Sequence, residues 1–178
     1  QTVYNRMEPL LLSGHPEAAL LFGVTGSGKT QVYMRLIDRA LQVGKSAIVL
    51  VPEIGLTPQL ICKFMAQFGG CTAVLHSALS VGERYDSWKR IRSGEARVIV
   101  GTRSAVFAPA QNLGLIILDE EQDDAYKSEN SPRYHARDVA KYRAMQENAF
   151  VLLGSATPAI ETFYGAETGK YPVLHLRE

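Results

Sequence analysis

The chain has 178 residues, of which 46% are hydrophobic and 21% are charged, and its formal net charge is +1. This composition is typical of a soluble globular domain of ordinary size, which is large enough to bury a single core. Because the net charge is so close to zero, the composition excludes a basic field over the whole molecule, and any contact with nucleic acid must be local.

Cysteine usage and hydropathy predict a cytoplasmic protein with no membrane partner. The two cysteines, Cys62 and Cys71, lack the C-x-x-C spacing of a zinc site, and we interpret both as reduced thiols. No signal peptide and no run of 18 apolar residues occurs. Both ends fall within regular patterns, since residues 3–11 are amphipathic and residues 173–178 resemble a strand. We therefore expect residues 1–178 to form one domain of a larger protein.

Apolar runs typical of buried parallel strands alternate with helical segments along the chain. We expect strands at residues 18–22, 47–51, 72–75, 97–101, 115–118 and 150–153, and helices at residues 30–43, 57–68, 80–93 and 135–147. Trp88, in the third of these helices, is expected to lie in the core. The alternation predicts an α/β fold with a mostly parallel central sheet. In such sheets ligands bind beyond the carboxyl ends of the strands, where the polar clusters of this sequence also fall.

The first strand leads into a phosphate loop, residues 23–30, whose sequence GVTGSGKT fits G-x-x-x-x-G-K-[ST]. Glycines let the backbone approach an anion closely, and the following helix directs its free N–H groups towards that anion. We expect Lys29 to reach the β- and γ-phosphates of ATP and the Thr30 hydroxyl to hold Mg²⁺. The candidate nucleotide site is Gly23, Thr25, Gly26, Ser27, Gly28, Lys29 and Thr30.

Two more strand ends carry candidate catalytic groups. The acidic loop, residues 119–122, follows the fifth strand; Asp119 is expected to hold Mg²⁺, and Glu120 to position the attacking water. Together with Lys29 these residues form the candidate catalytic set. The sixth strand ends at GSATP, where Ser155 and Thr157 suit a relay to the acidic loop. An ordinary capped turn is the alternative for that segment.

The order GVTGSGKT, LVPEIGLTPQ, GTRSA, DEEQ and GSATP resembles the superfamily 2 helicases. Longer strings at residues 76–80, 101–109 and 134–138 are similar to the bacterial primosomal replication-restart helicases among them. The resemblance extends from residue 20 to at least residue 162. It implies a three-layer RecA-like P-loop NTPase domain, the first of two ATPase lobes of an ATP-dependent 3′-to-5′ DNA helicase.

The resemblance also implies cofactors, partners and further site residues. The cofactors are ATP and Mg²⁺. The partners are single-stranded and forked DNA, primosome proteins, single-stranded-DNA-binding protein, and a second lobe and zinc-binding region that this sequence does not contain. Thr57, Thr102, Arg103 and Ser104 match motifs that hold the DNA backbone. Residues 123–137 match an aromatic-rich loop that senses DNA, in which Tyr126 and Tyr134 would stack on bases and Lys127, Arg133 and Arg137 would contact phosphates.

One position departs from the family pattern, because Gln122 stands where histidine is usual. Gln122, Ser155 and Thr157 are the expected coupling residues, and a glutamine there keeps a hydrogen-bonding side chain but cannot carry a proton. Two alternatives stay open at this point: a P-loop kinase or other nucleotide-dependent enzyme, and a binding module that uses nucleotide only as a switch. Without a second lobe we expect weak nucleotide binding and very slow hydrolysis, since an arginine finger contributes ~10³–10⁵ in rate.

Overall fold

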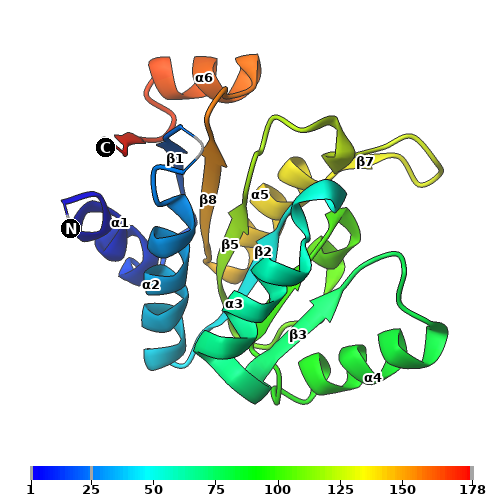
Figure 1. Cartoon of the computed structure of the whole chain (residues 1–178). Helices are drawn as coiled ribbons and strands as arrows, with labels where there is room; N and C mark the ends of the chain where they lie inside the picture. The colour runs from blue at the N-terminus through cyan, green and yellow to red at the C-terminus, as the bar shows by residue number, and fades with distance from the viewer. Residues whose placement is uncertain (1, 25, 177–178) are drawn as a thin grey trace.

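The computed structural model describes residues 2–24 and 26–176. Within them, seven parallel strands form one sheet in the order β3-β4-β2-β5-β8-β1-β9 (Figure 1). The strands are β1 (Glu17–Phe22), β2 (Ser46–Leu50), β3 (Thr72–Leu75), β4 (Val98–Gly101), β5 (Leu113–Leu118), β8 (Phe150–Ser155) and β9 (Val173–His175). The predicted α/β fold with a parallel central sheet is confirmed.

Helices cover both faces of the sheet, which makes three layers. They are α1 (Thr2–Leu12), α2 (Lys29–Gln42), α3 (Pro58–Phe68), α4 (Val81–Arg92), α5 (Ala136–Glu147) and α6 (Ile160–Glu167). Alternate residues of β5 show why the strands are apolar throughout: Ile117 packs in the cluster with α1, α2 and α3, and Ile116 in the cluster with α4 and α5. A strand buried on both faces needs an unbroken apolar run.

Local signals position the helix starts as the sequence predicts. Thr57 caps α3 by accepting a hydrogen bond from the Leu60 N–H at 3.2 Å, and Pro58 follows in the first turn. Ser80 and Glu83 form a capping box at the start of α4. Small residues on α5 — Ala136, Ala140 and Ala144 — are buried against the sheet.

Three features differ from the sequence predictions. Trp88 does not lie in the core, because α4 packs at the edge of the sheet and leaves the indole 38% exposed. The helix α6 was not among the predicted helices; its Ile160, Phe163 and Tyr164 have helical spacing but are exposed to solvent. A short antiparallel hairpin, β6 (Lys127–Ser128) and β7 (Tyr134–His135), lies within residues 123–137, where no strand was predicted. Of the terminal run, β9 covers residues 173–175, and residues 177–178 lie outside the described residues.

Candidate active site

The phosphate loop connects the carboxyl end of β1 to the start of α2. In the sheet, β1 lies between β8 and β9. Gly26 and Gly28 have φ angles of 85° and 90°, in the left-handed region that glycine adopts without strain. Gly28 is the N-cap of α2 and provides no side-chain cap, which leaves the first N–H groups of the helix free for an anion. Thr30 lies in the first turn of α2. Thr25 lies outside the described residues.

Two observations show that this loop fits a phosphate ligand. The Ser27 Oγ atom is buried and has no hydrogen-bond partner among the residues that the structure describes. An orphaned hydroxyl of this kind costs about 1–3 kcal/mol, which a bound phosphate oxygen would recover by accepting its hydrogen bond. At Gly23, a Cβ atom would come within 2.6 Å of Ser27 Oγ, so only glycine leaves room there.

Lys29 connects the phosphate loop to the acidic loop. Its side chain is only 8% exposed, and its Nζ atom donates to the Gly23 carbonyl oxygen at 2.9 Å. The same Nζ atom lies 3.3 Å from Glu120 Oε1. This pairing is possible because the two loops follow β1 and β5, the two strands that flank β8.

The acidic loop is held in a constrained geometry. Asp119 Oδ1 accepts a hydrogen bond from the Tyr33 hydroxyl at 2.8 Å. Burial raises the pKa of Asp119 above its usual range, while the Tyr33 hydrogen bond and the Lys29 charge act in the opposite direction. Glu120 has a φ of 47°, a strained conformation for a non-glycine residue that directs its carboxylate towards Lys29.

A chain of hydrogen bonds connects the acidic loop to the end of β8. The Gln122 side-chain amide donates to Glu120 Oε2 at 3.0 Å, and Ser155 Oγ donates to Gln122 Oε1 at 2.5 Å. Ser155 Oγ in turn accepts from the Thr157 backbone N–H at 2.9 Å, while the Thr157 side chain is exposed. The structure therefore brings the three expected coupling residues together, with Gln122 acting as donor and acceptor at once.

Glu121 is the centre of a second network, which the sequence reasoning missed. Its carboxylate has no exposed surface and contacts Arg137 at 3.0 Å, the Thr162 hydroxyl at 2.8 Å and the Ala159 N–H at 2.8 Å. The expectation that Arg137 contacts DNA phosphates is corrected: its side chain is only 11% exposed, and its guanidinium joins α5 to the acidic loop. The sequence alone does not distinguish the role of Glu121 from that of Glu120. The two differ in burial, which only the structure reveals.

Tyr33 is the other functional residue that was missed, since on α2 it has the spacing of a core residue. Tyr126 was expected to stack on bases, and this too is corrected. Its ring is fully buried, and its hydroxyl lies 2.6 Å from the Asp119 carbonyl oxygen and 2.9 Å from that of Leu50. Tyr126 therefore supports the backbone of the acidic loop from inside the core.

The remaining candidates lie along the carboxyl ends of β2, β3 and β4. Thr102, Arg103 and Ser104 line a pocket of about 230 Å³ together with Glu53 and Ser77. Thr102 is almost fully buried, whereas Ser104 is exposed. Thr57 does not line this pocket and is exposed at the start of α3.

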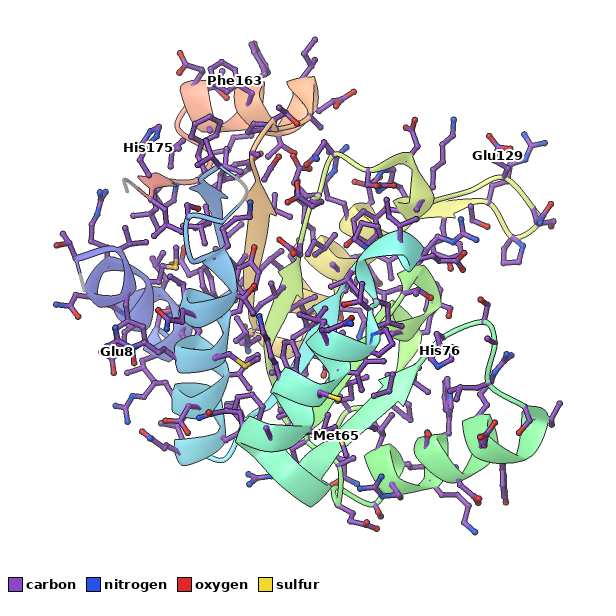
Figure 2. All side chains as sticks on the ribbon, viewed as in Figure 1. Glu8, Met65, His76, Glu129, Phe163 and His175 are labelled. Atoms are coloured by element: carbon purple, nitrogen blue, oxygen red, sulfur yellow. The ribbon has the colours of Figure 1, made fainter. Side chains whose placement is uncertain are left out.

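Arg103 joins this pocket to the hairpin. Its guanidinium donates to the carbonyl oxygens of Ala125, at 3.2 Å, and of Lys127, and it lies 5.9 Å from the centroid of the Tyr134 ring. Lys127, Arg133 and Tyr134 line a second pocket, of about 670 Å³, on the hairpin. In Figure 2 the labelled Glu129 marks this hairpin, which projects from the body of the molecule.

Within the described ranges, no helix is long and apolar enough to cross a membrane. The same residues contain no cluster of three or more His, Cys, Asp or Glu side chains that would hold a metal by themselves. Mg²⁺ usually keeps several waters and takes one or two protein ligands plus phosphate oxygens. Thr30 and Asp119, the residues expected to be such ligands, are the sequence neighbours of Lys29 and Glu120, which contact each other.

Comparison with known proteins gives a consistent result. The family model for the DEAD/DEAH box helicase matches residues 5–164. The replication restart protein PriA of Bacillus subtilis is 48% identical over 98% of this chain and 24% of that protein. Those of Synechocystis and Haemophilus influenzae are 53% and 51% identical, over 87% and 88% of this chain and 19% and 22% of theirs. The chain thus spans a quarter or less of the length of these curated relatives.

Solved structures share the fold. RecG bound to a three-way DNA junction has a TM-score of 0.67 at 22% identity, covering 99% of this chain and 23% of that one. A DEAD box protein from Methanococcus jannaschii has a TM-score of 0.67 at 22% identity, covering 98% of this chain and 49% of that one. At this level of identity these structures establish the architecture alone.

Proposed function

Because this chain belongs to the DEAD/DEAH box helicase family, we propose that it is the first ATPase lobe of an ATP-dependent 3′-to-5′ DNA helicase that restarts stalled replication forks. Membership in the family implies ATP binding and removes the alternative of a P-loop kinase. The observation that carries the proposal is the Lys29–Glu120 contact at 3.3 Å, which joins the phosphate-binding and acidic loops around β8. We take residues 1–178 as one lobe.

In this proposal the free N–H groups of α2 and the Lys29 ammonium bind the β- and γ-phosphates of ATP. Thr30 and Asp119 hold Mg²⁺, which would neutralise charge on the phosphates. We propose that Lys29 leaves Glu120 for a phosphate oxygen when nucleotide binds, because the negatively charged phosphates would compete with that carboxylate for the ammonium group. Glu120 is then free to accept a hydrogen bond from the attacking water and orient it.

The hydrogen-bond chain through Gln122 supports a role in coupling. A shift of Glu120 towards water alters the acceptor of the Gln122 amide, and Gln122 is bonded directly to Ser155 at the end of β8. Because glutamine carries no proton between partners, the coupling acts through position alone. The experimental sign would be that Gln122→Ala weakens DNA-stimulated ATP turnover more than it weakens nucleotide binding.

We propose that the carboxyl ends of β2, β3 and β4, together with the hairpin, contact DNA. The hydroxyls and cations there, which are exposed or half-buried except for the nearly buried Thr102, suit the sugar–phosphate backbone and carry no base specificity. The proposed contact residues are Thr57, Thr102, Arg103 and Ser104 at the strand ends and Lys127, Arg133 and Tyr134 on the hairpin. We further propose, from the similarity to the PriA proteins, that a second lobe, a zinc-binding region, primosome proteins and single-stranded-DNA-binding protein are partners, and that the protein acts in the cytoplasm.

The test of the nucleotide site is calorimetric titration with ADP and ATP in the presence and absence of Mg²⁺. We expect binding that Mg²⁺ strengthens and that Lys29→Ala abolishes, with Lys63→Ala, an exposed lysine on α3, as the matched control. Equal binding by the Lys29→Ala variant would contradict the proposal. A steady-state turnover that Lys29→Ala leaves unchanged would come from a contaminating ATPase. Nucleotide binding with no turnover, even when DNA and the second lobe are supplied, would favour the switch module.

A further inference from the structure

The helix α4 presents an outward face that no other part of the described chain covers. Val81, Tyr85 and Trp88, spaced four and three residues apart, are 87%, 62% and 38% exposed. Ile91 is the buried residue of this helix. In Figure 1, α4 lies at the lower right beside β3, the edge strand of the sheet. Three neighbouring aliphatic and aromatic groups exposed on one helix are unusual for a closed surface.

The charges on this face are all positive. A pocket of about 430 Å³ is lined by Val81, Arg84, Tyr85, Trp88, Lys89 and Arg92, which we call the α4 face. Of the two carboxylates of the helix, neither lines it, and Glu83 is bound to Ser80 in the capping box. Lys89 Nζ lies 5.2 Å from the centroid of the Tyr85 ring.

The cations of the α4 face are available for a ligand. Among the described residues, none of its three cations forms an ion pair, whereas Arg90 on another side of the same helix pairs with Glu95 at 2.7 Å. Unpaired cations beside two aromatic rings have the chemistry of a single-strand binding surface, in which bases stack on the rings and phosphates meet the cations.

The position of the α4 face supports the same ligand. The segment between β3 and α4 contains His76, labelled in Figure 2, and Ser77, whose hydroxyl donates to Glu53 at 3.2 Å within the pocket at the strand ends. The α4 face begins four residues after Ser77. From Val81 to Arg92 the helix rises about 16 Å. Tyr85 and Trp88 therefore lie in the first two turns of the helix that follows this segment of the strand-end pocket.

We propose that the α4 face binds single-stranded nucleic acid, with bases on Tyr85 and Trp88 and phosphates on Arg84, Lys89 and Arg92. This inference rests on the proposed function and adds a second contact surface beyond the strand ends. Because every side chain involved lies on the surface, substitution there leaves the nucleotide site intact.

The chain offers a built-in probe, since Trp88 is its single tryptophan. Titration of the whole chain with an oligothymidylate at low salt should change the Trp88 emission in a saturable way that added salt reverses. Trp88→Ala should weaken binding of a labelled oligothymidylate, measured by anisotropy, by about fivefold or more. Arg92→Ala should weaken it and lower the salt dependence, while Arg90→Ala, the matched control, should leave both unchanged.

The outcomes separate the inference from the function on which it rests. Oligothymidylate binding with unchanged Trp88 emission and with wild-type affinity in Trp88→Ala would overturn the inference and leave the proposed function standing. Equal weakening by Arg90→Ala and Arg92→Ala would also overturn it, because a general charge effect would then explain the data. No binding by any variant would count against DNA binding by the chain as a whole. Emission that changes with protein concentration alone would identify a protein-docking face instead.

Discussion

The carboxyl ends of the strands form two groups of side chains, one at β1, β5 and β8 and the other at β2, β3 and β4. These two halves of the strand-end edge differ in burial. At β1, β5 and β8, the charged side chains of Lys29, Asp119 and Glu121 are largely buried, and each contacts a partner within the fold, namely Glu120, Tyr33 and Arg137 respectively. At β2, β3 and β4 and on the hairpin, Ser104 and Arg133 are exposed to solvent. The nucleotide side is therefore ordered before its ligand arrives, whereas the proposed DNA side keeps its groups hydrated. Charged groups that are already held in place stabilise the charges that develop during hydrolysis. Hydrated groups make weaker, salt-dependent contacts that let a nucleic acid slide along the surface.

The largest effect is expected from a substitution of Glu121, which would disrupt the buried network at β5 and β8. Glu121→Ala leaves the Arg137 guanidinium without its partner and should lower the free energy of unfolding by about 3–5 kcal/mol. Urea denaturation measures this, with Glu129→Ala on the exposed hairpin as the control, for which a change within about 0.5 kcal/mol is expected. A loss below about 1 kcal/mol for Glu121→Ala would mean that the network is solvated and that the contrast between the two halves is smaller than described.

The second prediction displaces Tyr33 from Asp119. A Cβ atom on Gly154 would overlap the Tyr33 hydroxyl and come within 3.1 Å of its ring carbon Cζ. Gly154→Ala should therefore lower the free energy of unfolding by about 1–3 kcal/mol and weaken nucleotide binding. Adding Tyr33→Phe, which removes the overlapping hydroxyl, should restore part of the stability but not the hydrogen bond to Asp119. Equal stability of the single and double variants would contradict the overlap.

A smaller effect is expected on the exposed side, at Thr57. Thr57→Ala removes the cap of α3 and should cost about 1 kcal/mol of unfolding free energy, with nucleotide binding unchanged. Thr57→Ser keeps both the cap and the hydroxyl proposed to contact DNA, so it should match the wild type in both properties. If Thr57→Ala weakened nucleotide binding, the two halves of the edge would be coupled through α3, and the comparison would have to be redrawn.

The smallest effect is expected in the pH dependence of stability, through the partly buried His135. Burial lowers the pKa of His135 below its usual range, and its Nδ1 atom accepts from the Arg137 N–H at 3.2 Å to cap α5. The unfolded chain then binds more protons than the folded one, so stability is complete above about pH 6.5 and is lost as pH falls through the folded pKa. Thermal unfolding between pH 7.5 and 5 should show this loss. His135→Asn, which caps without titrating, should show less of it; identical slopes would contradict the assignment.

Sequence patterns predicted most of this fold because its strands are long apolar runs and its helices have recognisable starts. Lys29 and Asp119 were predictable for the same reason, since each follows a strand and lies in a short motif. Tyr33 and Glu121 were not, because their roles depend on partners far along the chain. Asp119 lies 86 positions beyond Tyr33, and Thr162 lies 41 beyond Glu121.

Two errors share a physical cause, which is that sequence pattern does not reveal the depth of burial. Tyr126 has polar neighbours and was expected at the surface, yet the 3-10 turn at Asp124–Tyr126 directs its ring into the core. Trp88 was expected in the core because α4 is amphipathic. The edge strand β3 is too narrow a support to cover more of that helix than Ile91.

The strand order also determines the order in which the strands can pair while the chain is being synthesised. Among the residues that the structure describes, the strand that carries the phosphate loop, β1, pairs with β8 and β9 alone, and β8 begins at Phe150. During translation at ~5–20 residues per second, β1 leaves the ribosome many seconds before either partner exists. Meanwhile β2, β3, β4 and β5 can already pair with one another. The nucleotide site is thus completed last, and a nascent chain cannot hold ATP until nearly all of these residues have been made.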